Sequence, residues 1–469
     1  MSFELYEYKI EDLGKVITGK TPPSKISDAF SAQGIPFVTP KDMDGRRLID
    51  KTERYLSSQG VEAVRNCLLP QNSIAVSCIG SDMGKTVLLP GESITNQQIN
   101  AIVVDSEHFD YKYVYYYLST LQDDFKAIAG GSATPILNKE HFNQFKVSLP
   151  VKPVQNKIAL ILDSLDTKIE VNTEINHTLE QMAQALFKSW FVDFEPVKAK
   201  MAVLESGGSQ EDATLAAMTA ISGKNADALA VFEREHPEQY AELKATAELF
   251  PLAMQDSELG EIPEGWTLSE IGAQIDIAGG ATPSTKTPDF WDNGDIHWTT
   301  PKDLSNVKDK ILLHTERKIT KAGLGKISSG LLPVNTVLMS SRAPVGYLAI
   351  AKVPVAINQG YIAMKCNKEL SPEFVLQWCS ANMPEIISRA SGTTFAEISK
   401  KNFNPIPLVK PPLELVKNYT KQVSAIYSLI ENTMRENNSL TELRDTLLPK
   451  LLSGEITLPE AEQIISEEA

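Results

Sequence analysis

A long internal duplication is the feature that most constrains how this chain can fold. The residues IPFVTPKD at 35–42 recur as IHWTTPKD at 296–303, an offset of 261 residues. Further matches at that offset, or one to two residues beyond it, pair GKTP at 19–22 with GATP at 280–283, LLP at 68–70 with LLP at 331–333, and Asn96-Gln97 with Asn358-Gln359. Solenoid repeats span roughly 20–50 residues, so a repeat of this length is a duplicated domain. We therefore predict two copies of one unit in the 469 residues.

Each copy begins with a globular part of mixed α/β class. The runs at 72–77 and 99–104 lie between Gly and Pro residues and predict strands. The segment 111–125 is predicted to form a helix. Together these elements predict an α/β or α+β fold with two pseudo-symmetric globular domains.

A long helix follows the globular part in each copy. No Gly or Pro occurs from 154 to 191, and apolar residues in a heptad pattern predict a coiled-coil seam. The seam residues are Ile158, Leu165, Leu179 and Leu186, with Ile161, Ile175 and Met182 beside them and Tyr419, Ile426, Leu440 and Leu447 in the second copy. Asn172 falls at a core position, where Asn can set the register. We prefer pairing of the two helices with each other, while an amphipathic helix on a core stays open.

These patterns divide the chain into six predicted segments. They are a first domain at 1–150, a helix at 151–195, an acidic helical insertion at 196–262, a second domain at 263–412, a second helix at 413–455 and an acidic tail at 456–469. The insertion has no counterpart in the second copy. Within it, 226–249 is expected to form one or two helices.

Composition and charge exclude several protein classes. The formal net charge is -15, and 201–262 alone holds three basic and twelve acidic residues. Such a chain cannot hold DNA by bulk charge, although basic side chains can still converge on one groove. No apolar run reaches the ~18 residues of a membrane span, and the first residues lack a secretory signal pattern, so we expect a cytoplasmic protein. The four cysteines lack metal-site spacing and are expected to be reduced and half-buried.

Catalytic motifs are absent or incomplete in this sequence. The stretch 79–86 resembles a phosphate-binding loop, but three residues instead of four separate Gly80 from Gly84. The stretch 193–198 carries two carboxylates and a lysine, yet it occurs once and is expected to be a solvated linker. The six histidines form no i, i+4 pair, and no Gly-x-Gly-x-x-Gly motif occurs, so neither a metal nor a cofactor is predicted in this chain.

Polar residues that recur in both copies remain as candidates for contact with DNA. Their side chains are of types that bond base edges and phosphates, although each also suits an ordinary turn. The candidates are Thr39, Lys41, Ser77, Ser81, Lys85, Asn96 and Gln97 in the first copy and Thr300, Lys302, Ser340, Ser341, Arg342, Asn358 and Gln359 in the second.

Six motifs carry a family resemblance over nearly the whole chain. They are GATPS at 280–284, WTTPKDL at 298–304, SSRAPVG at 340–346, INQG at 357–360, LFKSWFVDF at 186–194 and LRDTLLPKLLSG at 443–454. With the duplication, they make the chain resemble the specificity subunits of type I restriction–modification systems (HsdS). The first copy has Cys78-Ile79 where the second has Ser341-Arg342, so the two copies are expected to recognise different sequences.

The resemblance implies two target recognition domains, held apart by an antiparallel pair of spacer helices. Each domain would read one half of a bipartite site in double-stranded DNA. The chain itself would be non-catalytic and would carry no cofactor. Two methyltransferase subunits, with S-adenosylmethionine, and usually restriction subunits, with ATP and Mg, would dock on it.

Two other functional classes stay open at this point. One is an enzyme, either a stand-alone DNA methyltransferase or an ATPase with degenerate motifs, and the other is a scaffold without a role on DNA. Methyl transfer or ATP turnover by the purified chain would favour the enzyme, and a DNA footprint of two half-sites would exclude the scaffold.

Overall fold

The computed structural model describes residues 3–128, 136–305, 307, 309–392 and 396–468. The other positions of the predicted domains lie outside this part of the chain. The chain forms two compact units, of which unit 1 is Met1–Val171 with Glu436–Ala469 and unit 2 is Asn172–Arg435. The boundaries predicted at 150 and 412 fall inside these units, so the six predicted segments stay predictions.

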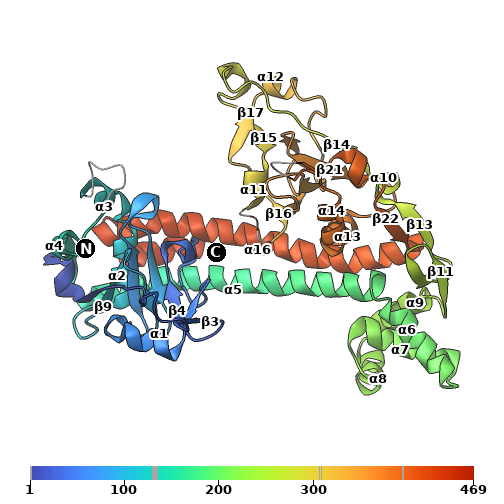
Figure 1. Ribbon diagram of the computed structural model, residues 1–469, viewed down its shortest axis with the longest axis horizontal. Coiled ribbons are helices and arrows are strands. Elements are labelled where there is room, and N and C mark those ends of the chain that lie inside the picture. Colours follow the sequence, from blue (N-terminus) through green and yellow to red (C-terminus); the bar gives the residue numbers. More distant parts are fainter. Residues whose placement is uncertain (1–2, 129–135, 306, 308, 393–395, 469) are drawn as a thin grey trace. The chain divides into compact units, whose positions relative to one another are not determined.

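Unit 1 contains a globular part, lobe 1, with three small sheets (Figure 1). Its strands are β1 (Tyr6–Lys9), β2 (Gly14–Thr18), β3 (Phe30–Ser31), β4 (Ile35–Val38), β5 (Tyr55–Leu56), β6 (Ser73–Ser77), β7 (Thr86–Leu89), β8 (Ile94–Thr95), β9 (Ile99–Val104) and β10 (Lys146–Leu149). The sheets have the orders β2-β9-β6-β7, β3-β5-β4-β8 and β1-β10. The helices of lobe 1 are α1 (Ser58–Ala63), α2 (Tyr111–Ser119), α3 (Gln122–Ile128) and α4 (Lys139–Gln144).

Unit 2 contains the corresponding lobe 2. Its strands are β13 (Thr267–Glu270), β14 (Asp276–Ala278), β15 (Ile296–Thr299), β16 (Ile311–Leu312), β17 (Arg317–Ile319), β18 (Val337–Ser340), β19 (Leu348–Ala351), β20 (Val355–Ile357), β21 (Tyr361–Lys365) and β22 (Pro407–Lys410). The sheets have the orders β14-β21-β18-β19-β16, β17-β15-β20 and β13-β22. The helices of lobe 2 are α10 (Ile271–Gln274), α11 (Pro301–Ser305), α12 (Lys321–Leu324), α13 (Pro372–Ala381), α14 (Met383–Ser388) and α15 (Lys400–Phe403).

The two lobes have equivalent backbones. The order β14-β21-β18-β19 repeats β2-β9-β6-β7, and β17-β15-β20 repeats β5-β4-β8. Single hydrogen bonds recur as well, since Ile10 N donates to Phe145 O and Ile271 N donates to Ile406 O, each at 3.0 Å. The mixed α/β class and the duplication are therefore confirmed.

The local predictions for lobe 1 are confirmed for the strands and wrong for the helix. Strands β6 and β9 occupy the predicted runs. The single helix expected over 111–125 is instead two helices, because α2 ends at Ser119 and α3 begins at Gln122. Between them, Ser119 Oγ and Thr120 Oγ1 each donate to a backbone carbonyl three residues earlier, at 2.7 Å. Hydroxyls that bond nearby carbonyls compete with the helical backbone, which accounts for the break.

Two long helices, α5 (Lys152–Phe191) and α16 (Leu413–Ser453), each contribute one half to each unit. In unit 1, Arg444 on α16 contacts Asp166 on α5 at 2.6 Å, and Glu436 contacts Lys168 at 3.3 Å. Residue numbers fall along α16 as they rise along α5, so these halves pair antiparallel. None of the described helices is both long and apolar enough to cross a membrane.

The halves in unit 2 also pair antiparallel. Tyr427 OH on α16 donates to Glu180 Oε2 on α5 at 2.7 Å, and the Tyr419 ring lies 5.9 Å from that of Phe187. Trp190 and Phe374 complete a buried aromatic cluster that joins lobe 2 to the helices. Truncating one such ring to alanine typically costs about 3–5 kcal/mol.

The predicted main seam of α5 is correct, with Leu179 and Leu186 half-buried against the core of unit 2, but the seam beside it is wrong in the second half of the helix. Ile158 and Leu165 are buried, whereas Ile175 and Met182 are 42% and 54% exposed. The buried positions of the second half are Asn172, Asn176, Glu180, Ala183, Phe187, Trp190 and Phe191. A straight α-helix drifts about 20° per heptad, so its buried face moves away from a strict heptad. Three of those residues are polar. The heptad had placed Asn172 in the core, but Asn176 and Glu180 lie off the heptad, and an apolar pattern cannot detect them.

The insertion folds as four short helices and a hairpin within unit 2. The elements are α6 (Glu195–Glu205), α7 (Gln210–Ser222), α8 (Ala226–Glu235), α9 (Pro237–Glu248), β11 (Met254–Ser257) and β12 (Gly260–Pro263). Helices α8 and α9 confirm the expectation for 226–249. The solvated linker expected at 193–198 is wrong, because Phe194 and Val197 are buried in the core of unit 2. Last in the chain is α17 (Leu458–Glu468), which packs Ala461 into the core of unit 1.

Each lobe contacts the helix halves of its own unit through a polar cluster. Seat 1, in unit 1, joins Arg47 of lobe 1 to Asp163, Asp166 and Glu170 of α5. Seat 2, in unit 2, joins Lys310 and Gln377 of lobe 2 to Glu180 of α5 and Tyr427 of α16.

Candidate nucleic-acid interface

Parallel strand pairing brings two of the candidate motifs to one edge of each lobe. In lobe 1, β4 and β8 run parallel with Val38 opposite Thr95, so the turns that follow them meet. In lobe 2, β15 and β20 run parallel with Thr299 opposite Ile357. The carboxyl ends of parallel strands lie at the same edge. Thr39 and Lys41 therefore lie beside Asn96 and Gln97 in lobe 1, and Thr300 and Lys302 lie beside Asn358 and Gln359 in lobe 2.

An aspartate closes the Thr-Pro-Lys-Asp turn in both lobes. In lobe 1, Asp42 Oδ2 accepts hydrogen bonds from Thr39 N at 2.8 Å and Thr39 Oγ1 at 2.7 Å. In lobe 2, Asp303 Oδ2 accepts from Thr300 N at 2.7 Å and Thr300 Oγ1 at 3.1 Å. This capping satisfies backbone donors at the start of a helical turn and leaves the lysine side chain exposed.

The Asn-Gln turn is bonded to the strand beside it. Asn96 N donates to Val38 O and Asn358 N donates to Thr299 O, each at 3.0 Å. A threonine of the Gly-x-Thr-Pro motif then holds each glutamine. Thr21 Oγ1 donates to Gln97 Oε1 at 2.8 Å, and Thr282 Oγ1 donates to Gln359 Oε1 at 2.7 Å.

The glycine of Gly-x-Thr-Pro is required by close backbone approach. A Cβ atom on Gly19 would lie 2.3 Å from Thr95 O, and one on Gly280 would lie 2.0 Å from Ile357 O. Only a residue without a side chain fits at these distances. The recurrence of this glycine in both copies follows from this packing.

A third turn is hydrogen-bonded through its backbone to the Asn-Gln turn in each lobe. Cys78 N donates to Gln98 O and Ser341 N donates to Gly360 O, each at 2.8 Å. We call the turns at 39–42, 77–85 and 96–98 the turn face of lobe 1, and those at 300–303, 340–347 and 358–360 the turn face of lobe 2. The structure therefore brings the candidates of each copy together.

The candidates differ in how far they reach solvent. Ser77, Ser340 and Ser341 are buried, and Ser340 Oγ donates to Pro344 O at 2.7 Å and accepts from Tyr347 N at 2.8 Å. Ser340 therefore holds the turn, while the buried hydroxyls of Ser77 and Ser341 make no hydrogen bond to the described residues, and none of the three is presented to solvent. The exposed candidates are Lys41, Ser81, Gln97, Lys302 and Gln359, and the half-buried ones are Thr39, Lys85, Asn96, Thr300, Arg342 and Asn358.

The charged candidates have different carboxylate partners. Lys302 contacts Glu316 at 2.8 Å, and this hydrogen bond raises the pKa of Lys302. Lys85 contacts Asp82 at 2.8 Å, and Arg342 lies 3.9 Å from Glu397. Exposed pairs of this kind contribute little stability and can exchange their partner for a phosphate.

The turn faces offer hydrogen-bond donors and acceptors and not an activated nucleophile. Cys78 is the thiol on the turn face of lobe 1, and burial raises its pKa to about 11, so it stays protonated at neutral pH. Cys67 and Cys379 are also buried and Cys366 is half-buried, so the half-buried state expected for all four thiols is wrong for three of them.

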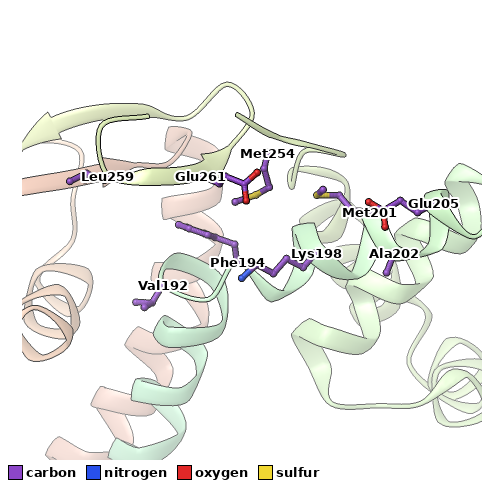
Figure 2. Close-up of a pocket in the computed structure, with 9 residues that line it drawn as sticks. All are labelled: Val192, Phe194, Lys198, Met201, Ala202, Glu205, Met254, Leu259 and Glu261. Carbon is purple, nitrogen blue, oxygen red and sulfur yellow. The ribbon is translucent and has the colours of Figure 1, made fainter. Parts of the chain in front are cut away.

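Two further features of the described residues lie away from the turn faces. A cavity of about 570 Å³ lies between α6 and the β11–β12 hairpin, and its lining combines apolar side chains such as Phe194 and Met201 with Lys198, Glu205 and Glu261 (Figure 2). Asp105, Glu107 and His108 lie within reach of one metal ion, but all three are exposed, and exposed acidic groups are common without an ion. Neither feature recurs in the second copy.

Comparison with known proteins identifies the family of this chain. The family model for the type I restriction modification DNA specificity domain matches the chain twice, at residues 4–181 and 263–442. The chain belongs to this family. Two specificity domains in one chain make it a specificity subunit of a type I restriction–modification system, which confirms the resemblance seen in the sequence.

Relatives support the assignment along most of the chain. The type I restriction enzyme HindI specificity subunit of Haemophilus influenzae is 35% identical over 332 residues, which cover 69% of this chain and 71% of that protein. The MjaIX specificity subunit of Methanocaldococcus jannaschii is 24% identical over 461 residues, which cover 96% and 93%. The crystal structure of an S subunit from M. genitalium shares the fold, with a TM-score of 0.51, 15% identity and 96% coverage of both chains.

Several residues of the specificity domains were not singled out from the sequence. Asp42 and Asp303 fix the turns, and the recurrence of the full Thr-Pro-Lys-Asp motif is the signal that could have found them. Arg54 and Arg317 flank the same turns, and the signal that could have found them is the tripeptide Thr-Glu-Arg, which recurs at 52–54 and 315–317, two residues beyond the main offset.

Proposed function

We propose that each lobe reads one half of a bipartite double-stranded DNA site with its turn face. One observation carries this proposal: the two turn faces have the same backbone hydrogen bonds but different side chains. Cys78 and Ile79 of lobe 1 stand where lobe 2 has Ser341 and Arg342. A shared scaffold with different side chains suits two readers of different sequences, because base edges are read by side chains.

We further propose that the chain is non-catalytic and carries no cofactor. Two methyltransferase subunits would bring S-adenosylmethionine, and restriction subunits, where present, would bring ATP and Mg, all in the cytoplasm. Exposed apolar side chains on α5 support subunit docking, since Leu160 is 71% exposed and Met182 is 54% exposed. Native mass spectrometry of the co-expressed complex is expected to give two methyltransferase subunits per chain, and a chain without any contradicts this part.

Footprinting of the complex on DNA tests the reading of two half-sites. We expect protection of two short sequences with an unspecified gap between them. Arg342→Ala is expected to relax recognition in one half-site by about 1–3 kcal/mol and leave the other intact, because a guanidinium that contacts a base contributes in that range. Arg435→Ala is the control, because this arginine lies on α16 and pairs with Glu431. Equal loss at both half-sites contradicts the assignment of one lobe to one half.

The enzyme alternative is tested with the purified chain alone. Methyl transfer to DNA, or ATP hydrolysis above the level of a mock purification, would overturn the non-catalytic role. Activity that appears only after the methyltransferase or restriction subunits are added supports it.

A further inference from the structure

Each lobe presents an exposed arginine that lies over two aromatic rings. In lobe 1, the guanidinium carbon of Arg54 is 4.7 Å from the centre of the Phe30 ring and 5.2 Å from that of Phe37. The two rings pack edge to face, with their centres 5.4 Å apart. A planar guanidinium over an aromatic face is held by a cation–π attraction, which fixes its orientation while leaving its N–H groups free.

Lobe 2 repeats this arrangement with different rings. The guanidinium carbon of Arg317 is 3.6 Å from the centre of the Trp291 ring and 5.5 Å from that of Trp298. These rings also pack edge to face, 5.0 Å apart. Phe37 and Trp298 occupy the same position in the duplicated motif. The stacked arginine has therefore kept its place in both lobes although the rings beneath it differ.

The same two arginines differ from the rest in their electrostatic surroundings. The chain contains ten arginines. Eight of them have a carboxylate oxygen within 4.0 Å, namely Arg46, Arg47, Arg65, Arg234, Arg342, Arg389, Arg435 and Arg444. Within the described residues, no such ion pair is found for Arg54 or Arg317. An oriented cation without an anionic partner is suited to bind an external anion.

Each arginine also lies next to a turn face. The neighbouring Glu53 N donates to Asp42 Oδ1 at 2.8 Å, and Glu316 N donates to Asp303 Oδ1 at 2.8 Å. These are the aspartates that close the Thr-Pro-Lys-Asp turns. The residue before each stacked arginine is thus hydrogen-bonded to the turn face, which carries Lys41 in lobe 1 and Lys302 in lobe 2.

We propose that Arg54 and Arg317 each bind a phosphate of the DNA backbone at the edge of the half-site read by their lobe. This inference rests on the proposed function. A phosphate is favoured over a base because both lobes keep the arginine while their turn faces differ. The phosphate backbone is the part of DNA that is the same in every half-site.

Salt dependence of binding by the complex provides the test. The probes are a duplex with the two half-sites mapped by footprinting and a duplex of scrambled sequence. Arg54→Ala and Arg317→Ala are each expected to lower the slope of log affinity against log salt by about 0.9, and the double variant by about 1.8. Each single loss corresponds to binding about eightfold weaker at 0.1 M salt on both duplexes. Arg65→Ala and Arg234→Ala are the controls, since both are exposed arginines with a carboxylate neighbour.

The conservative variants Arg54→Lys and Arg317→Lys separate a phosphate contact from a packing role. They keep the charge, so the salt slope is expected to stay near that of the unchanged chain. If the arginines only covered the rings, all four variants would change the thermal unfolding temperature and leave the slope of log affinity against log salt unchanged. That result would overturn the proposal. A loss of affinity that depends on a single base pair of the mapped site also overturns the proposal, because it indicates a contact with a base. In both cases the footprint of two half-sites would persist, so the proposed function would stand without this inference.

Discussion

Seat 1 and seat 2 join equivalent lobes to the long helices with different chemistry. Arg47 and Lys310 are equivalent, because Leu88 N donates to Arg47 O and Ile350 N donates to Lys310 O, each at 2.8 Å. Seat 1 surrounds its cation with several charges, while seat 2 relies on a single buried carboxylate, Glu180, bonded by neutral groups. The duplication has kept the cation and replaced its surroundings.

The difference arises on the helices as well as on the lobes, where Arg47 and Tyr116 of lobe 1 stand against Lys310 and Gln377 of lobe 2. Asp166 of α5 accepts from Tyr116 OH at 2.6 Å and pairs with Arg444 of α16. The position on α16 that corresponds to Asp166 is Tyr427, a neutral donor. Seat 2 therefore takes its carboxylate from α5. The two lobes share a fold but are not interchangeable on their seats.

The largest expected effect is at seat 2. Glu180→Ala leaves Lys310, Gln377 and Tyr427 without their common acceptor. The loss is expected to cost about 3–5 kcal/mol, because the half-buried ammonium of Lys310 loses its carboxylate and the buried donors of Gln377 and Tyr427 lose their acceptor. All five tryptophans, Trp190, Trp266, Trp291, Trp298 and Trp378, belong to unit 2. Urea unfolding followed by tryptophan fluorescence therefore reports on this unit.

A matched control for seat 2 is Glu233→Ala, at an exposed position of α8. It is expected to change stability by less than about 0.5 kcal/mol. If Glu180→Ala behaved like this control, seat 2 would not hold lobe 2 to the helices.

A smaller effect is expected at seat 1. Arg47→Ala removes hydrogen bonds to Asp163 and Glu170, but Asp163 keeps Lys112 and Asp166 keeps Arg444. We expect a loss of about 1.5–3 kcal/mol, the range for hydrogen bonds to charged groups. Hydrogen exchange of lobe 1 measures it, with Arg65→Ala as the control. A shift of the tryptophan-detected transition instead would contradict the separation of the two seats.

The smallest expected effect is a pH dependence confined to seat 1. Burial alone would raise the pKa of Asp163, but hydrogen bonds from Lys112 and Arg47 outweigh it and lower the pKa below the usual 3.8. A lowered folded pKa means that the carboxylate stabilises the fold above pH ~4 and loses this contribution as the pH falls through the folded value. Exchange protection of lobe 1 is expected to drop below pH ~4. Asp163→Asn should remove that part of the drop, and an unchanged profile would refute the role of Asp163.

Much of the architecture could be predicted from the sequence because it depends on local patterns. The recurrence of Thr-Pro-Lys-Asp located both turn faces, and the absence of Gly and Pro over 154–191 predicted α5. The break at Thr120 and the burial of Ser340 could not be predicted in this way. Both depend on which backbone groups lie nearby, and turn residues have the same composition whether they face solvent or the core.

The sequence by itself determined the duplication, the class of fold and the family, since these are properties of residue order. Only the tertiary structure decided which polar residues meet. Glu180 joins Tyr427 across 247 positions, and Arg54 reaches Phe30 because β5 pairs with both β3 and β4. A contact between distant segments depends on the direction and burial of each side chain. Those are set when strands and helices pack, and they leave no periodic trace in the chain.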